Sequence, residues 1–248
     1  MNISGNTILI TGGGSGIGRG LAEALRKAGN QIIISGRRQE ALDAVVAANP
    51  GMAALSVDMT DTASIAALAA AAVDRFPDLN VVINNAGIMI NEDVTDDFLD
   101  IAERTVATNL LGPIRLTAGL LPHLLQQPSA TIVTVSSGLA FVPKADTPTY
   151  SATKAAIHSY SQSLRHQLRN TSVEVLEIAP PYVRTSLQGE RQATDPNAMP
   201  LDEYVAETMS LLATQPADGE ILVQRVYRQR FAERDGNASA VFSAINPS

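Results

Sequence analysis

The regular alternation of short β-branched segments with longer alanine- and leucine-rich segments constrains the fold most. The short segments are apolar throughout, which is typical of strands in a parallel sheet covered on both faces. The predicted strands are Thr7–Thr11, Gln31–Ser35, Ala53–Val57, Asn80–Asn84, Ala130–Ser136, Val173–Ile178 and Glu220–Gln224. The predicted helices are Gly16–Ala28, Arg38–Ala48, Asp61–Arg75, Phe98–Gln126 with a break near Gly112-Pro113, Thr149–Arg169 and Asp202–Thr214. This order predicts right-handed crossovers and an α/β fold, a Rossmann-like doubly wound sheet of about seven parallel strands with helices on both faces.

The chain is expected to form a single domain over residues 1–248, because no linker, repeat or low-complexity segment divides it. Two segments rich in proline and small residues, 138–149 and 180–200, follow predicted strands. In an open parallel sheet, ligands bind beyond the carboxyl ends of the strands, where such loops lie. We therefore expect the region of about 180–215 to form the substrate loops.

The composition excludes several classes of function. The absence of cysteine rules out disulfides, thiolate catalysis and cysteine-ligated metals, and none of the three histidines has the spacing of a metal site, so no metal is expected. The formal net charge of −7 argues against a nucleic-acid or anionic-membrane partner. The longest nearly apolar run, 63–73, is too short to span a bilayer, and the N-terminus does not resemble a signal peptide. The expected location is the cytoplasm.

A glycine-rich segment, Thr11-Gly-Gly-Gly-Ser-Gly-Ile-Gly18, follows the first predicted strand and opens the first predicted helix. Gly12 permits a tight turn, Gly16 lets backbone amides approach a pyrophosphate, and Gly18 allows close packing of helix on strand. The helix N-terminus then faces the phosphates. Plain structural turns also contain glycine clusters, but this position between strand and helix predicts a dinucleotide site.

The end of the second predicted strand favours NADP(H) over NAD(H). An acidic residue there would bind the ribose 2′-hydroxyl of NAD, whereas arginine accommodates the 2′-phosphate of NADP. Gly36 stands where the acid is expected, followed by Arg37 and Arg38. Cations at a helix start oppose the helix dipole, which favours an anionic partner over the plain alternative of two solvated arginines. We expect Arg37, and secondarily Arg38, to bind this phosphate.

Tyr150 and Lys154 are one helical turn apart and so project from one helix face. An unperturbed phenol titrates near pH 10, and a nearby ammonium is expected to lower its pKa toward useful acid–base chemistry. Tyrosine and lysine are scarce, so the spacing is expected by chance only roughly 0.06 times in a chain of this composition. His158, two turns beyond Tyr150, is expected to pack in the core or contact a second subunit.

Two further polar residues are candidates for the same site. Ser137 lies at the end of the fifth predicted strand, directly after Ser136, and its hydroxyl would donate to a developing alkoxide, although Ser136 competes for this role. Asn109 lies in an apolar helical stretch. Its side chain could bond to the backbone and kink the helix beside Gly112-Pro113, and this interpretation is as good as a catalytic role. The residues alone leave both alternatives open.

Together these residues resemble the short-chain dehydrogenase/reductase superfamily, from about Asn6 through Thr185. The matching elements, in the order and spacing of the family, are Thr11–Gly18, Asp58, Asn84-Asn-Ala-Gly87, Asn109, Ser137 and Tyr150-Ser-Ala-Thr-Lys154. The resemblance implies a seven-stranded Rossmann-like sheet, an NAD(P)-dependent oxidoreductase and assembly as a homodimer or homotetramer.

The resemblance also implies roles for individual residues. Tyr150 is the general acid/base, and Lys154 holds the nicotinamide ribose while lowering the phenol pKa. Ser137 polarises the carbonyl, and Asn109 orders a water in the proton relay. Asp58 resembles the adenine contact. The expected cofactor contacts are Gly12, Gly14, Ser15, Gly16, Ile17, Gly18, Arg37, Arg38, Asp58, Met59, Asn85, Ala86, Gly87, Tyr150, Lys154, Pro180, Val183 and Thr185.

The chain departs from the family pattern in three places. Ser15 stands where many NADP-binding members carry a second basic residue. The usual Pro-Gly pair after the sixth strand is Pro180-Pro181 here, and the second proline removes an amide donor and stiffens the loop. The usual Asp-Gly-Gly near the seventh strand is absent. The last two features resemble the branch named for the short-chain oxidoreductase of teichoic-acid D-alanylation operons.

The expected substrate wall is apolar and has no obvious cluster that would grip a carboxylate or phosphate. It comprises Leu139, Phe141, Val142, Tyr182 and Leu187. The arginines at 184, 225, 228, 230 and 234 are expected to form solvated ion pairs with neighbours such as Glu233 and Asp235. The expected activity is that of a ketoreductase or alcohol dehydrogenase, which interconverts a hydrophobic ketone and a secondary alcohol with NADP(H).

Two rival functions stay open from the sequence. One is a non-catalytic NADP(H)-binding sensor or scaffold, because a fold does not fix a function. The other is a sugar-nucleotide epimerase or dehydratase that uses a related tyrosine–lysine pair. The short region after Thr185 leaves little room for the nucleotide-sugar domain that this second activity requires.

Overall fold

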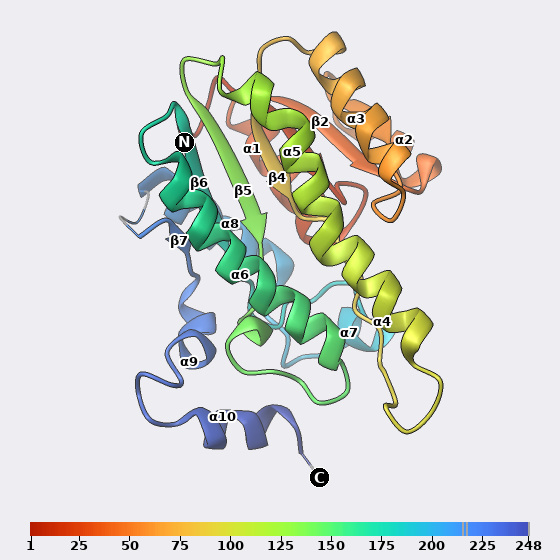
Figure 1. Ribbon diagram of the computed structural model, residues 1–248, viewed down its shortest axis with the longest axis vertical. Coiled ribbons are helices and arrows are strands. Elements are labelled where there is room, and N and C mark those ends of the chain that lie inside the picture. Colours follow the sequence, from red (N-terminus) through yellow and green to blue (C-terminus); the bar gives the residue numbers. More distant parts are fainter. Residues whose placement is uncertain (215, 217, 248) are drawn as a thin grey trace.

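The computed structural model describes residues 1–214, 216 and 218–247, and these form a parallel sheet between two layers of helices (Figure 1). Its seven strands have the order β3-β2-β1-β4-β5-β6-β7. They are β1 (Thr7–Thr11), β2 (Gln31–Gly36), β3 (Ala53–Ser56), β4 (Leu79–Asn84), β5 (Ala130–Val135), β6 (Val173–Ile178) and β7 (Glu220–Ile221). Each neighbouring pair is parallel, so the predicted Rossmann-like sheet is confirmed. The strand order reverses between β1 and β4, the place where open α/β sheets bind ligands.

The two helical layers cover opposite faces of the sheet because successive side chains of a strand point to opposite sides. Ile8 and Ile10 of β1 face a core that includes buried residues of α1, α2 and α8. Leu9 faces the other core, beneath α3, α5 and α6. The bounds of these helices are α1 (Gly16–Lys27), α2 (Gln39–Ala48), α3 (Thr62–Arg75), α5 (Gly112–Leu124), α6 (Pro148–Leu168) and α8 (Leu201–Thr214).

The predicted break near Gly112-Pro113 is wrong, because the helix continues through this point. α4 (Leu99–Val106) runs into a π-helical turn, η1 (Ala107–Leu111), and then directly into α5. Pro113 lies in the first turn of α5, where its missing amide costs little. A Cβ at Gly112 would lie 2.9 Å from the carbonyl oxygen of Met59, so glycine lets the helix pass close to the loop after β3. Such π-helical turns are frequent at functional sites.

The C-terminal region contains short helices that the sequence did not predict. They are α7 (Glu190–Thr194), α9 (Tyr227–Arg230) and α10 (Ala238–Ile245). The last predicted strand is shorter than expected, since the chain leaves the sheet after Ile221 and turns into the 3₁₀ helix η3 (Gln224–Val226). Figure 1 shows α9 and α10 in blue at one end of the molecule, and there Asn246 accepts a hydrogen bond from the Ala145 amide at 2.6 Å.

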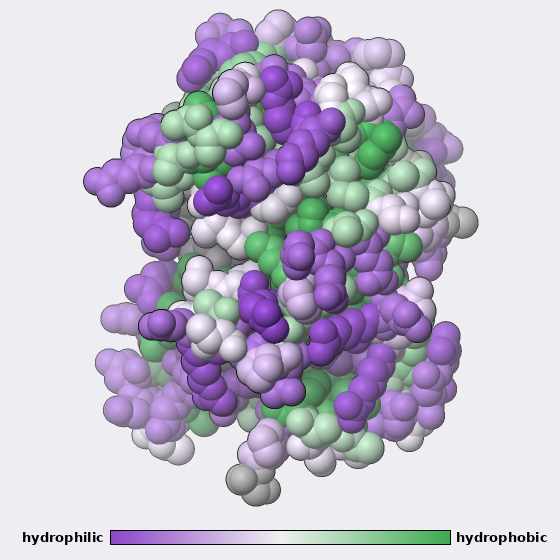
Figure 2. All heavy atoms as spheres, turned by 180° about the vertical axis from the view of Figure 1, so that it is seen from behind, coloured by the Kyte–Doolittle hydropathy of each residue, from purple (hydrophilic) through white to green (hydrophobic). Residues whose placement is uncertain are grey.

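The surface opposite to the view of Figure 1 is dominated by hydrophilic residues, with apolar residues visible between them (Figure 2). Within the described residues, no helix is both long enough and apolar enough to cross a bilayer.

Candidate active site

The glycine-rich turn between β1 and α1 has the shape of a phosphate-binding loop. Gly12 and Gly16 have φ angles of 70° and 54°, a left-handed conformation that favours glycine. A Cβ at Gly18 would lie 2.5 Å from the carbonyl oxygen of Gly12, so only glycine lets α1 begin this close to β1. Ser15 is the N-cap of α1, but its side chain makes no capping hydrogen bond. The first amides of α1 are therefore open to an anion, which fits a dinucleotide pyrophosphate.

The other predicted residues of this turn are less constrained. A Cβ at Gly14 would make only ordinary contacts, at 3.5 Å from Ala41. Ile17 is partly buried against the core beneath α1, so its backbone rather than its side chain is placed for a cofactor.

Thr11, which was not among the predicted contacts, connects this turn to the loop after β4. Its hydroxyl accepts hydrogen bonds from the amides of Asn85 and Ala86, both at 3.0 Å. The Asn85 side chain donates to the Thr11 carbonyl oxygen at 2.8 Å. The two loops are thus held together where the strand order reverses. A threonine at the last position of the strand before a glycine-rich turn is the signal that would have identified this residue.

Arg37 and Arg38 follow β2 and are exposed. Asp58, after β3, has a lowered pKa, chiefly because Thr60 donates to it from its amide (2.9 Å) and hydroxyl (2.7 Å), and to a smaller degree because Arg37 lies nearby. The predicted adenine contact and the predicted phosphate contact therefore lie in one neighbourhood. Met59, in contrast, buries its side chain in the core, so it offers a cofactor only its backbone.

Gly87 lies where the loop after β4 meets η1 and α6. A Cβ at this position would be 3.4 Å from Oδ1 of Asn109 and 3.7 Å from Nζ of Lys154. Asn109 accepts from the Ile88 amide at 2.9 Å and donates to the Ile88 carbonyl oxygen at 2.8 Å. Its side chain therefore bonds to the loop after β4 rather than to its own helix, and it fixes that loop beside Lys154.

Ser137 and Tyr150 line one cavity, and of the two candidate serines only Ser137 does so among the described residues. Its Oγ accepts from the Leu139 amide at 3.1 Å, which leaves the hydroxyl proton free to donate. Ser136 is buried, and its hydroxyl donates to the Ile178 carbonyl oxygen at 3.4 Å. Burial raises the pKa of Tyr150 to about 12, and its hydrogen bond with Ser137 acts in the opposite direction.

Lys154 lies one turn from Tyr150 on α6 and is buried. Its Nζ donates to the Val135 carbonyl oxygen at 2.7 Å and is 5.5 Å from the centroid of the Tyr150 ring. Burial lowers the pKa of Lys154 to about 8, against an opposing effect of Glu177. In this structure, burial dominates the pKa of both groups and the Lys154 ammonium hydrogen-bonds to the sheet, so the expectation that Lys154 lowers the phenol pKa stays a prediction for the cofactor-bound protein.

The cavity that Ser137 and Tyr150 line has a volume of about 770 Å³. Of the predicted substrate residues, Leu139, Tyr182 and Leu187 line it. Phe141 does not, because its ring packs edge-on against His158, with the centroids 4.8 Å apart, and lies under the Arg230 guanidinium. Val142 is also buried elsewhere, in a small core that α10 covers.

The loop after β6 brings the remaining predicted cofactor residues to the same place. Pro180 lines the cavity, and Thr185 lies 3.5 Å from where a Cβ of Gly16 would be, so this loop reaches the glycine-rich turn. Gln192, a buried residue of α7 that was not predicted, donates to the Val183 carbonyl oxygen at 2.7 Å and to the Thr185 hydroxyl at 3.3 Å. Of the described residues in the predicted substrate region of 180–215, those that line the cavity lie between 180 and 195.

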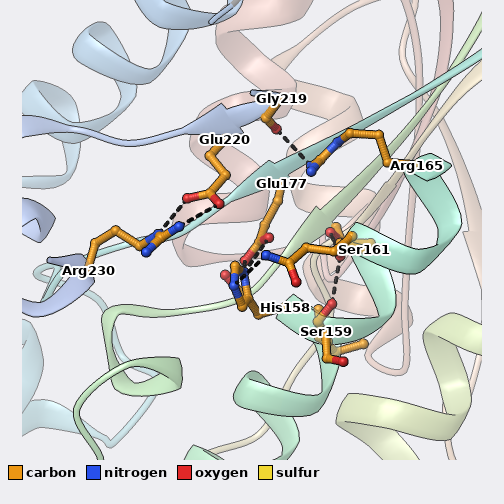
Figure 3. Close-up of polar contacts among 12 residues, drawn as sticks. His158, Ser159, Ser161, Arg165, Glu177, Gly219, Glu220 and Arg230 are labelled. Atoms are coloured by element: carbon orange, nitrogen blue, oxygen red, sulfur yellow. Dashed lines mark hydrogen bonds and ion pairs between the residues drawn. The ribbon is translucent and has the colours of Figure 1, made fainter. Parts of the chain in front are cut away.

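A buried polar cluster lies behind α6, between β6 and β7 (Figure 3). His158 Nδ1 is 2.8 Å from Glu177, and Arg230 donates two hydrogen bonds to Glu220, at 2.6 and 2.9 Å. His158, Glu177 and Glu220 approach within 4.8 Å, close enough to hold a metal ion. However, Arg230 already donates to both oxygens of Glu220, so its guanidinium balances the charge of that carboxylate. The cluster therefore packs α6 against the sheet.

Comparisons with known proteins agree with this arrangement. The family model of the short chain dehydrogenases matches residues 6–196. The chain is 42% identical to the uncharacterized oxidoreductase DltE of Bacillus subtilis (strain 168) over 241 residues, which cover 94% of each protein. It is 30% identical over 215 residues to an uncharacterized oxidoreductase of Staphylococcus epidermidis, with 84% of this chain and 91% of that protein covered.

Solved structures show the same similarity. A short-chain dehydrogenase from Streptomyces avermitilis superposes with a TM-score of 0.84 at 28% identity, with 96% of both chains covered. A short-chain dehydrogenase from Sphingobium yanoikuyae, solved in complex with NADPH, gives a TM-score of 0.81 at 27% identity, with 98% of this chain and 97% of that chain covered. The fold, the glycine-rich turn, the tyrosine–lysine pair and these matches show that the chain belongs to the short-chain dehydrogenase family of oxidoreductases.

Proposed function

We propose that the protein is an NADP(H)-dependent oxidoreductase that interconverts a ketone and a secondary alcohol. The observation that carries the proposal is the joint position of Ser137 and Tyr150 on one cavity, with Lys154 one turn behind. A serine donor and a buried phenol then reach the same carbonyl oxygen from two elements, the end of β5 and the start of α6. The nicotinamide cofactor supplies or accepts the hydride.

The chain's own residues provide the proton chemistry. At neutral pH, a phenol whose pKa burial has raised to about 12 keeps its proton, so Tyr150 is ready to donate it to a developing alkoxide. The Ser137 hydroxyl donates a hydrogen bond to the same oxygen and stabilises its negative charge. Asn109 holds the loop at Ile88 and thereby fixes the wall next to Lys154. This arrangement favours reduction at neutral pH, and oxidation is expected to accelerate as the pH rises.

The preference for NADP(H) is supported by Arg37 and Arg38, which are exposed beside the end of β2 and bond to no other described side chain. Asp58 interacts electrostatically with Arg37, and its Oδ1 already accepts two hydrogen bonds from Thr60. Because Gly36 has no side chain, a 2′-phosphate would meet the two guanidinium groups without a competing carboxylate.

The experiment that tests the proposal follows NADPH absorbance while purified protein is mixed with a panel of ketones and, in reverse, secondary alcohols. Tyr150→Phe is expected to lower kcat by at least about a hundredfold, since it removes the proton donor, while the affinity for NADPH stays close to that of the wild type. Near-normal turnover by this variant would contradict the mechanism. NADPH binding without oxidation by any ketone would favour a non-catalytic sensor instead.

Two predictions about assembly and location accompany this function. We expect a homodimer or homotetramer in the cytoplasm. Sedimentation equilibrium of the purified protein measures the subunit number, and a monomer at micromolar concentration would contradict the first of the two.

A further inference from the structure

The cavity beside Tyr150 concentrates positive charge in a chain that is acidic overall. The chain has 25 acidic and 18 basic residues. Among the described residues that line the cavity, however, the basic side chains outnumber the one carboxylate, that of Asp195; they are Lys144, Arg191, Arg225 and Arg228. The composition by itself would give a modest excess of acids around a cavity, and this cavity shows the opposite balance.

The basic residues reach the cavity from separate parts of the chain. Lys144 lies in the loop after β5, Arg191 on α7, Arg225 in η3 and Arg228 on α9. They are therefore not one solvated run of charge, as neighbouring basic residues in a sequence often are. The fold brings them to one cavity.

Their partners show which of them are available to a ligand. Lys144 pairs with Asp146 at 2.8 Å, and Arg225 donates to the Asn197 carbonyl oxygen at 2.8 Å. Arg191 and Arg228 make no hydrogen bond or ion pair with any residue that the structure describes. The expected ion pairing with Glu233 and Asp235 is thus wrong for Arg228, and of these two acids only Asp235 is paired, to Arg234 at 2.8 Å.

The one carboxylate in the lining offsets only part of this charge. Asp195 accepts from the Tyr182 hydroxyl at 3.1 Å and from the Asn197 amide at 2.8 Å. Arg191 lies near enough to Asp195 to affect it electrostatically but is not bonded to it. Two guanidinium groups therefore face the cavity with unused donors.

The rest of the wall is largely apolar. It includes Met89, Ile90, Leu139, Leu187, Val241 and Ile245. None of the residues of the glycine-rich turn belongs to the described lining, so the phosphates of a dinucleotide would lie elsewhere. An anion in this cavity would belong to the substrate.

We propose that the substrate carries a carboxylate or phosphate group on an apolar body, and that Arg191 and Arg228 bind this group while the carbonyl lies at Ser137 and Tyr150. The guanidinium group matches both oxyanions in a two-bond geometry, and an excess of positive charge around a cavity raises the local concentration of such a ligand. The inference rests on the proposed ketone–alcohol chemistry and replaces a purely hydrophobic substrate by an amphipathic one.

The test compares straight-chain oxo acids of increasing length with their methyl esters, as substrates of the wild type and of Arg191→Gln and Arg228→Gln. The wild type is expected to prefer the acid in kcat/KM, and each variant to reduce the acid-to-ester ratio about tenfold through KM. Added salt is expected to lower the same ratio. Arg234→Gln removes an equal charge outside the cavity and is the matched control, with an unchanged ratio.

Binding to the cofactor-loaded protein separates this inference from the proposed function. Octanoate and its neutral amide lack a ketone, so calorimetry measures their affinity without any turnover. Tighter binding of octanoate, weakened about tenfold in Arg228→Gln, supports the anion site even if no ketone is reduced. Equal affinity for the two, or an acid-to-ester ratio that the two arginine substitutions leave unchanged, would overturn it. Turnover of esters but not of acids would also overturn it while leaving the proposed function intact.

Discussion

Lys154 is a buried cation, and its electrostatic cost can be measured without any substrate. Its side chain is 4% exposed, and burial lowers its pKa from 10.5 to about 8. Replacing Lys154 by Met removes the charge at nearly constant length. The substitution is best made in a Tyr150→Phe background, because burial also shifts the pKa of the neighbouring phenol and that phenol would otherwise titrate in the same range.

The sign of the effect follows from the direction of the shift. The folded-state pKa of Lys154 lies below the unfolded value, so the unfolded chain binds the proton more tightly. The contribution of Lys154 to stability is therefore full above pH 10.5 and is lost as the pH falls through about 8. The shift from 10.5 to about 8 corresponds to about 3 kcal/mol in total. As the pH rises from 7 to 10, about 2 kcal/mol of this free energy of unfolding is regained.

Urea unfolding followed by far-UV circular dichroism measures the free energy, since the chain has no tryptophan to report by fluorescence. Relative to Tyr150→Phe, the double variant with Lys154→Met is expected to lose about 2 kcal/mol of stability on going from pH 7 to pH 10. Lys27→Met in the same background is the control, because Lys27 is exposed and its substitution should give a nearly constant difference. A difference that is flat with pH for Lys154→Met would refute the burial argument.

Two substitutions test the cofactor end of the site. Gly36→Asp is expected to shift the kcat/KM preference from NADPH toward NADH by at least about tenfold, because the carboxylate repels the 2′-phosphate. Gly36→Asn is the neutral control. An unchanged NADPH-to-NADH ratio in Gly36→Asp would mean that Arg37 does not bind this phosphate. Gly18→Ala is expected to cost about 1–3 kcal/mol and to weaken nucleotide binding, because its Cβ would lie 2.5 Å from the Gly12 carbonyl oxygen, whereas Gly14→Ala has room. Thermal denaturation measures both alanine variants, and equal losses would contradict the packing argument.

The parallel sheet and most of the candidate site were predictable because they depend on local patterns. Strands that are apolar throughout indicate burial on both faces whatever their neighbours are. Tyr150 and Lys154 share a helix face by spacing alone, and Ser137 follows a strand whose carboxyl end must open toward the ligand side. The choice between Ser136 and Ser137 required the structure. It depends on which of the two hydroxyls donates to the Ile178 carbonyl oxygen, and that one is Ser136.

The elements that escaped prediction are those whose conformation depends on distant contacts. The helix around Asn109 was expected to break at Gly112-Pro113, but a π-helical turn accommodates the proline, and the glycine lets the backbone pass close to Met59. The short helices α7, α9 and α10 have few turns of their own to stabilise them. Their positions are held by side chains such as Gln192 and Asn246, which bond to backbone groups elsewhere in the fold.

The charge of the cavity shows most clearly why sequence proximity misleads. Arginines 225–234 lie near acids in the sequence, so mutual neutralisation was the natural expectation. In the structure, Arg230 instead pairs with Glu220 on β7, and only Arg234 pairs with its neighbour Asp235. Arg228, two residues before Arg230, points to the cavity because successive positions on a short helix face different directions. An arginine that the fold separates from the acids beside it in the sequence keeps its donors for a ligand. The proposal of an anionic substrate therefore rests on the three-dimensional arrangement and not on the composition.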